Sequence, residues 1–240
     1  MARTLNPESH ALKRDAFIDV AQRLIQTKGY EALSVQGVLD VLDASKGAFY
    51  HYFGSKADLL EAVVERMADG VEAAWADVMA DPDLTGAQRL DAVFSTTAQY
   101  KAERKDFVMA VLELWLSDQN AIVREKLRRL ATRRMTPVLV QIVRKGVADG
   151  EFTANDPDAT AVVVAALIQG TSEVAGDLYL AAQSGSIGLA EVEAAFAAYT
   201  EALERILGLP AGRLHPVDKS VLELWFTPGI PVQSASKGTP

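Results

Sequence analysis

Five ring side chains stand in a row in the stretch SKGAFYHYFGSKADLL, which runs from Ser45 to Leu60. Lys46 and Lys56 bracket the row, which itself contains tyrosine and histidine. Lysine ammonium groups bind phosphate oxygens, and tyrosine and histidine bind phosphates or the edges of bases. The flanking Ser-Lys-Gly and Gly-Ser-Lys segments favour a short helix over a strand. The chemistry of the row therefore depends on which rings form a core and which stay outside.

A rotation of 100° per residue along this helix separates the row into two faces. One face can pack against neighbouring helices, and the other has no apolar neighbour in the sequence and is expected to stay exposed. The packed face is Ala48, Phe49, Tyr52 and Phe53, and the exposed face is Lys46, Gly47, Tyr50 and His51.

The elements around the row predict how it is positioned. Apolar residues recur at helical spacing from residue 17 to a glycine C-cap at residue 29, and Ser34 is suited to cap a second, short helix. Ser45 caps the helix that carries the rings, and a fourth helix starts at Ser55. Two short helices joined by a turn form a helix-turn-helix, whose second helix fits the DNA major groove. On geometry alone a short aromatic helix is more often a packing element than a DNA reader, so both interpretations remain open here.

The stretch AFIDVAQRLIQTKGYEALSVQGVLDVLDASKGAFYHYFGSKADLLEAV resembles the DNA-binding domain of the TetR (tetracycline repressor) family. It matches the pattern A..L....GY...S...V....S.G..Y.YF..K..LL with every gap of the expected length, across residues 12 to about 70. The resemblance implies a homodimeric, all-α, ligand-responsive transcription regulator, usually a repressor. Its implied partners are a palindromic double-stranded DNA operator and a small-molecule effector.

Position by position, the resemblance also implies which residues touch DNA. Gly37 stands where an acidic residue often completes a capping box, and Ala48 limits direct base reading to contact with a thymine methyl group. Gln36 is suited to read an adenine with two hydrogen bonds. The implied phosphate anchors are Ser34, Ser45, Tyr50 and Lys56, and the positions that meet bases or backbone are Gln36, Lys46, Gly47, Ala48, His51 and Tyr52.

The rest of the chain predicts further helices and no strands. Residues 1–56 are expected to form the DNA-binding domain, residues 57–208 a helical ligand-binding and dimerisation domain, and residues 209–240 a loose C-terminal tail with a short helix at 218–226. The expected fold is therefore all-α. The helical patterns of the second domain fall at 87–102, 105–117, 120–149, 157–184 and 189–207.

Two further sets of residues are candidates for the functions that the resemblance implies. Aromatic and apolar residues of the middle helices suit a hydrophobic or aromatic effector, although core packing is the commoner role for each. Residues on the last two long helices suit a four-helix dimer interface, and an intrachain hairpin explains them equally well on sequence alone. The effector candidates are Trp75, Phe94, Tyr100, Phe107, Leu112, Trp115, Met135 and Leu139, and the interface candidates are Leu167, Val174, Leu178, Phe196, Tyr199 and Leu203.

Composition excludes several other classes of protein. Cysteine is absent and the three histidines are scattered, so the sequence predicts no metal site, no cofactor and no enzyme. No signal peptide or membrane span is evident, which favours a cytoplasmic protein without a membrane partner. The net charge of −8 is uneven, because residues 1–56 carry +1 and the remainder −9. The basic run at 124–134 is interpreted as a solvated helix face or, alternatively, as a contact for an anionic ligand. A transcriptional activator, or a helical adaptor without DNA binding, is the alternative function.

Overall fold

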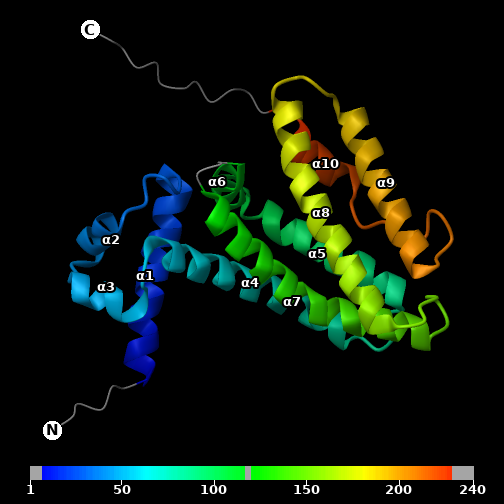
Figure 1. Ribbon diagram of the computed structural model, residues 1–240, viewed down its shortest axis with the longest axis horizontal. Helices are drawn as coiled ribbons and strands as arrows, with labels where there is room; N and C mark the ends of the chain where they lie inside the picture. The colour runs from blue at the N-terminus through cyan, green and yellow to red at the C-terminus, as the bar shows by residue number, and fades with distance from the viewer. Residues whose placement is uncertain (1–6, 117–119, 229–240) are drawn as a thin grey trace. The chain divides into compact units, whose positions relative to one another are not determined.

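In the computed structural model, the described residues are 7–116 and 120–228, and among them the chain forms helices and no strand (Figure 1). The expected all-α fold is confirmed. The ends of the helices from residue 87 onward lie within a residue or two of the predicted ones, whereas the first helix begins ten residues before the apolar pattern at residue 17. The helices are α1 (Pro7–Lys28), α2 (Val35–Leu42), α3 (Lys46–Tyr52), α4 (Lys56–Ala80), α5 (Gly86–Ala102), α6 (Lys105–Leu116), α7 (Ala121–Ala148), α8 (Pro157–Gln183), α9 (Leu189–Leu207) and α10 (Lys219–Phe226).

The chain divides into two compact units, and three helices belong to both. The first unit takes residues up to 74 together with 99–134, and the second takes residues 75–98 and those from 135 onward. The division therefore falls inside α4, α5 and α7. The first unit extends beyond the predicted DNA-binding domain of residues 1–56, because α6 and the first half of α7 share its core.

The core of the first unit is built around the rings of α1 and α3. Phe17 of α1 packs edge-on against Phe49 and Phe53, with ring centroids 5.8 and 6.1 Å apart. Phe107 of α6 and Leu127 of α7 join the same cluster of buried residues. Burying an aromatic side chain of this size stabilises a domain by roughly 1.5–3 kcal/mol. This cluster holds α3 against the body of the unit and fixes the direction of its outer face.

Ion pairs attach α4 to α1 and to α7 within the first unit. Arg66 of α4 pairs with Asp19 of α1. Lys126 of α7 lies 3.2 Å from Asp58 near the start of α4, and Arg134 lies 2.5 Å from Glu72 further along. Charges that hold helices together in this way are not free for a ligand. Much of the basic run at 124–134 is thus engaged within the chain, which favours the first interpretation of that run.

A close approach of helices organises the second unit. A Cβ atom placed on Gly86 of α5 would lie 2.6 Å from the Cα atom of Gly146 on α7, and one on Gly146 would meet the ring of Phe152 at 2.2 Å. A side chain at Gly86 would push the two helix backbones apart, and one at Gly146 would displace the Phe152 ring. Glu151 completes the junction, since its carboxylate accepts from the Ala87 N–H at 2.9 Å.

The segment after α9 is ordered, so the predicted loose tail is wrong for residues 209–228. Glu204 is only 3% exposed, and its carboxylate accepts from the N–H groups of Gly212 and Leu214 at 3.1 and 2.8 Å. Its burial acts to raise the pKa of this carboxyl, but the backbone N–H groups together outweigh burial and lower the pKa. The short helix expected at 218–226 is present as α10, while residues 229–240 lie outside the described part of the chain.

Helices α8 and α9 pack side by side, and α10 packs against both (Figure 1). The ring of Phe196 on α9 meets that of Phe226 on α10, with centroids 5.7 Å apart. One side of the α8–α9 pair is therefore covered by the chain's own C-terminal segment. α8 is long and apolar enough in composition to span a membrane, with a mean hydropathy of 1.3 over 18 residues, yet only 22% of that stretch is buried. Much of its apolar surface has no cover within the chain.

Candidate DNA-binding surface

The two short helices α2 and α3 begin and end as the sequence predicts. The Ser34 hydroxyl accepts from the Gly37 N–H at 3.0 Å, and the Ser45 hydroxyl accepts from the Ala48 N–H at 3.2 Å. Asp43 ends α2 in the left-handed region with φ at 49°, and this allows the chain to reverse towards α3. Both serines retain a hydroxyl proton for donation to a phosphate.

The outer face of α3 carries the side chains that the rotation of 100° per residue predicts there. Tyr50 is 58% exposed although it is an aromatic residue, and Lys46, Gly47 and His51 are also exposed. The opposite face is buried, with Phe49 at 0% and Phe53, which caps the helix, at 4%. The predicted division of the rings into two faces is thus confirmed. The buried rings hold the helix, and the exposed ones are available to a partner.

Lys56 is held in place by an aromatic ring. Its ammonium nitrogen lies 4.0 Å from the centre of the Tyr30 ring, a cation–π contact. Partial burial lowers the pKa of Lys56, and the nearby charge of Glu31 acts in the opposite direction. A lysine held on a ring at the start of α4 loses less side-chain entropy when it binds a phosphate.

Three residues of the predicted DNA-contact set are partly buried or already hydrogen-bonded within the chain. Tyr52 is half-buried, and its ring lies between Phe17 and His10, with centroids 5.7 and 4.7 Å away. Ala48 is also half-buried. Gln36 is exposed on α2, but its amide nitrogen already donates to Asp40 at 2.7 Å.

His10 is a residue of this surface that sequence reasoning missed. It lies in the first turns of α1, and its ring contacts that of His51 edge-on, with centroids 5.3 Å apart. Its position seven residues before Phe17 was the available signal, since that spacing puts both on one helix face. The N-terminal part of α1 therefore adjoins the exposed face of α3.

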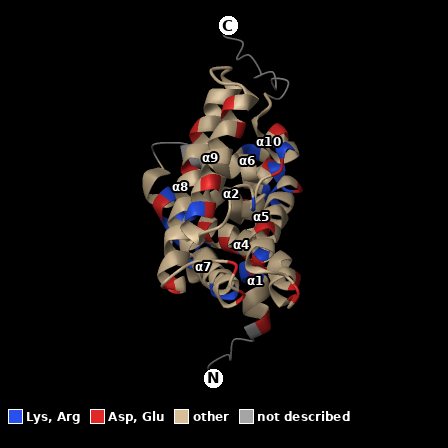
Figure 2. Cartoon of the chain, turned by 90° about the vertical axis from the view of Figure 1, so that its right-hand side faces the viewer, with Lys and Arg blue, Asp and Glu red and all other residues tan. Residues whose placement is uncertain are grey.

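The arrangement can bind a nucleic acid backbone and present side chains to base edges. Residues of both charges, Lys and Arg as well as Asp and Glu, occur along the helices (Figure 2). The local set of Lys46, His51 and Lys56 lies on one short helix and its flank, together with hydroxyl groups. Among the described residues no group of three or more metal-ligating side chains occurs.

The predicted effector residues are divided between the two units. Trp75, Phe94, Met135 and Leu139 belong to the second, and Trp75 donates its indole N–H to Thr97 at 2.9 Å. Tyr100, Phe107 and Leu112 belong to the first, in which Phe107 is 1% exposed within the core. The side chain of Trp115 lies outside the described ones. Effector binding by these residues stays a prediction.

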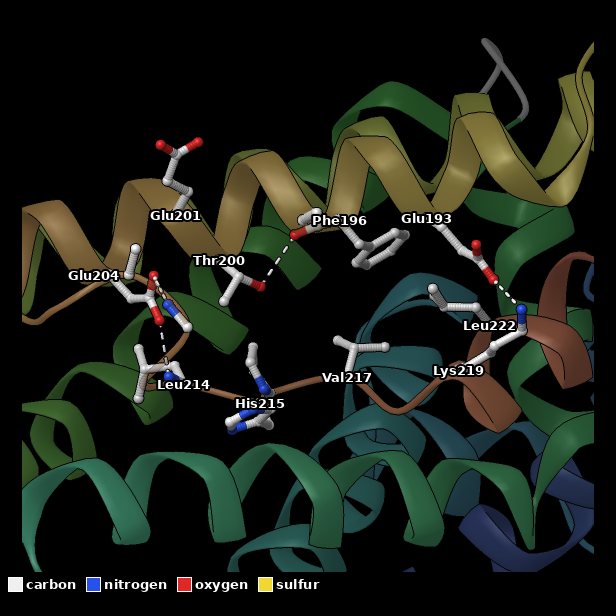
Figure 3. Close-up of a pocket in the computed structure, with 14 residues that line it drawn as sticks. Glu193, Phe196, Thr200, Glu201, Glu204, Leu214, His215, Val217, Lys219 and Leu222 are labelled. Atoms are coloured by element: carbon white, nitrogen blue, oxygen red, sulfur yellow. Dashed lines mark hydrogen bonds and ion pairs between the residues drawn. The ribbon is translucent and has the colours of Figure 1, made fainter.

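A pocket of about 440 Å³ lies instead beside α9 and α10, in the second unit. Phe196 and Val217 point into the same space from α9 and from the 209–218 segment, and Lys219 pairs with Glu193 at one end (Figure 3). None of the predicted effector residues lines it. Among its polar lining groups, Glu204 is bonded to the backbone of Gly212 and Leu214.

The predicted dimer-interface residues differ in how far they are exposed. Leu178 and Phe196 pack against α10 within the chain, and Leu203 is 5% exposed. Leu167 and Tyr199 are half-buried, while Val174 is 37% exposed. The uncovered apolar surface of α8 includes other residues, notably Val162 and Val163 at 55% and 52%.

The fold and this surface define a class of protein, an all-α DNA-binding regulator with a helix-turn-helix. Residues 17–63 match the family model described as "Bacterial regulatory proteins, tetR family". The chain carries the DNA-binding domain of the TetR family, as the sequence resemblance predicts. The family and the curated relatives below are transcriptional regulators and not enzymes.

Curated relatives and solved structures agree with this assignment. The chain is similar to the HTH-type transcriptional repressor KstR2 of Mycolicibacterium smegmatis, with 25% identity over 170 residues that cover 70% of this chain and 80% of the relative. KstR2 of Rhodococcus jostii is 23% identical over 153 residues, with 60% and 69% covered. Among solved structures, RolR in complex with its ligand resorcinol has a TM-score of 0.61 at 17% identity, covering 95% of this chain and 100% of that one. That structural likeness supports the fold alone.

Proposed function

We propose that this protein is a homodimeric repressor that binds a palindromic operator and is released from it by a small hydrophobic or aromatic effector. The observation that carries the DNA-binding part is the exposed face of α3, where Tyr50 stands 58% exposed beside Lys46 and His51 while Phe49 and Phe53 are buried. Repression is supported by the two KstR2 relatives, which are transcriptional repressors.

The uncovered surface of α8 and α9 supports the dimer. Val163 and Val174 are exposed and lie eleven residues apart on α8, a spacing of about three helical turns that places them on one face. The exposed residues of α9 include alanines that repeat at helical spacing and permit close packing, namely Ala190, Ala194, Ala197 and Ala198. A second copy of the chain is the occupant that this surface fits, because a two-fold dimer reads both halves of a palindrome. This surface replaces Leu178 and Phe196 in our proposed interface.

The proposed effector is a small hydrophobic or aromatic molecule. The sequence predicts an apolar lining, and Trp75 and Leu139 of the second unit are apolar side chains that are 4% and 1% exposed. The structural relative RolR is described with resorcinol, a small aromatic ligand. An aromatic or hydrophobic effector is accordingly the class we propose.

Operator selection followed by a salt titration tests the DNA-binding proposal. A palindromic site should be enriched from random duplex DNA. A dimer that makes about six or more phosphate contacts should lose roughly a thousandfold in affinity between about 50 and 200 mM salt. Failure to enrich any sequence, or an affinity that does not change with salt, would contradict the proposal.

A further inference from the structure

Two polar side chains on the exposed face of α2 are bonded to each other, and the proposed function uses only one of them. Gln36 donates from its Nε2 atom to Oδ1 of Asp40 at 2.7 Å, across one helical turn. Both residues are exposed. A carboxylate on a surface that meets phosphates weakens binding to every DNA sequence. On the proposed DNA-binding surface, Asp40 therefore lowers the affinity for DNA of every sequence. A useful role for Asp40 must come from a property other than overall affinity, such as base specificity.

The chemistry of Asp40 determines which way the Gln36 amide points. An ionised carboxylate only accepts hydrogen bonds, so Gln36 must turn its NH₂ group towards Asp40 and its carbonyl oxygen away. The NH₂ group has two hydrogens, and Asp40 uses one of them. Gln36 keeps one N–H and the carbonyl oxygen, which are the donor and the acceptor that adenine requires at N7 and N6.

We propose that Asp40 is a positioning residue that orients Gln36 for adenine and so sets base specificity at one position of each operator half-site. Without an acceptor-only neighbour the amide of Gln36 turns over freely. The two N–H groups of Gln36 can then donate to the N7 and O6 acceptors of guanine as readily as the N–H and carbonyl oxygen pair with adenine. This inference rests on the proposed DNA-binding function. It adds Asp40, which is not among the DNA contacts implied by the family resemblance.

Two other roles for Asp40 are distinguishable from this one. A pair four residues apart on a helix also supports the helix itself, which would change stability but not specificity. A carboxylate can also accept directly from cytosine N4, which would alter a base pair other than the one that Gln36 reads. The test must therefore measure specificity position by position.

The experiment compares full-length variants on the selected operator and on the three other base pairs at each position. Asp40→Asn removes the charge with little change of shape and replaces the acceptor-only group by an amide. Asp43→Asn is the matched control, because it removes the same charge at the end of α2, where asparagine tolerates the left-handed backbone. Gln36→Ala, the Gln36→Ala/Asp40→Asn pair and Asp40→Glu complete the set.

Both asparagine variants should bind all sequences more tightly, since each removes a negative charge. Gln36→Ala should lose about 5-fold to 150-fold of the discrimination at one base pair per half-site. Asp40→Asn should lose at least about threefold at that same base pair, and Asp43→Asn none. Asp40→Glu, which keeps an acceptor-only group, should retain discrimination. In the Gln36→Ala background, Asp40→Asn should have no further effect on specificity.

The possible contrary results separate the two proposals. A wild-type protein that selects no operator overturns the DNA-binding function itself. If the wild type selects one and Asp40→Asn keeps the profile of Asp43→Asn, only the positioning role of Asp40 is overturned. A change at a different base pair that adds to the effect of Gln36→Ala would also overturn it, since Asp40 would then read a base directly.

Discussion

At the scale of single residues, substitution of Tyr50 should impair DNA binding, whereas substitution of Phe53 should impair stability. Tyr50 is 58% exposed, so Tyr50→Ala should abolish tight operator binding and leave the melting temperature nearly unchanged. Phe53 is 4% exposed in the aromatic core, so Phe53→Ala should destabilise the first unit by about 3–5 kcal/mol. Thermal unfolding and operator titration of both variants check this. If Tyr50→Ala unfolds the unit while Phe53→Ala is harmless, the exposed face of α3 has been assigned to the wrong side.

The sequence predicts whether a residue is buried or exposed where the helical periodicity alone determines its face. The rings of α3 separate by helical geometry alone, because seven residues define two faces, and Phe49 and Tyr50 lie on the sides expected. The contact of His10 with His51 joins residues 41 positions apart, so only the packing of α1 on α3 reveals it. The bond from Gln36 to Asp40 is local, but its meaning depends on which face of α2 is exposed.

At the scale of elements, helix boundaries follow from caps, whereas the path of the C-terminal segment does not. Ser34, Ser45 and Asp156 cap their helices with their own side chains, and each is visible in the sequence. The order of residues 209–218 depends on Glu204, a buried carboxylate that holds backbone N–H groups eight and ten residues away. A Pro- and Gly-containing segment gives no periodic signal for such an anchor, and this is why it was expected to be loose.

Removal of this anchor should release the segment. Glu204→Ala leaves the N–H groups of Gly212 and Leu214 without their acceptor, which should cost about 1–3 kcal/mol of the free energy of unfolding. Glu201→Ala is the matched control, since Glu201 lies one turn earlier on α9 and its exposed carboxylate pairs with Arg205 of the same helix. Chemical denaturation of the two variants should show a loss for Glu204→Ala alone.

The same carboxylate gives the prediction a direction with pH. The pKa of Glu204 is lowered in the folded chain, so its contribution to stability is fully present above its ordinary value of 4.5. That contribution is lost as the pH falls through the folded pKa. The difference in unfolding free energy between wild type and Glu204→Ala should therefore narrow at acid pH. A difference that widens on acidification would show that the carboxylate is not the group that anchors the segment.

At the scale of the whole molecule, the uncovered face of α8 should hold the dimer together. Val163→Asp places a charge where the side chain is 52% exposed in one chain and would be buried in a dimer. The variant should remain folded, sediment as a monomer and bind the operator far more weakly. Ile122→Asp is the control, because Ile122 is 80% exposed on α7 and belongs to the first unit, whereas α8 and α9 belong to the second. A Val163→Asp variant that remains dimeric would move the interface elsewhere.

Effector and operator should also oppose each other across the whole molecule. The helix α4 starts four residues after α3 ends, belongs to both units and is tied to α1 and α7 by ion pairs. A shift of α4 therefore moves the support of α3, the recognition helix that we propose to enter the major groove. A dimer that reads successive major grooves needs its two recognition helices about 34 Å apart. An effector can change that spacing only through its different affinity for the two states, and a coupling of about 1–3 kcal/mol weakens operator binding by roughly 5-fold to 150-fold. By linkage, operator DNA must weaken effector binding by the same factor.

A screen for small molecules that raise the melting temperature of the protein would supply a candidate effector. Titration of that effector with and without the operator should give two effector affinities, and their ratio should equal the factor by which the effector weakens DNA binding. Equal affinities in the two titrations would exclude this mechanism of release.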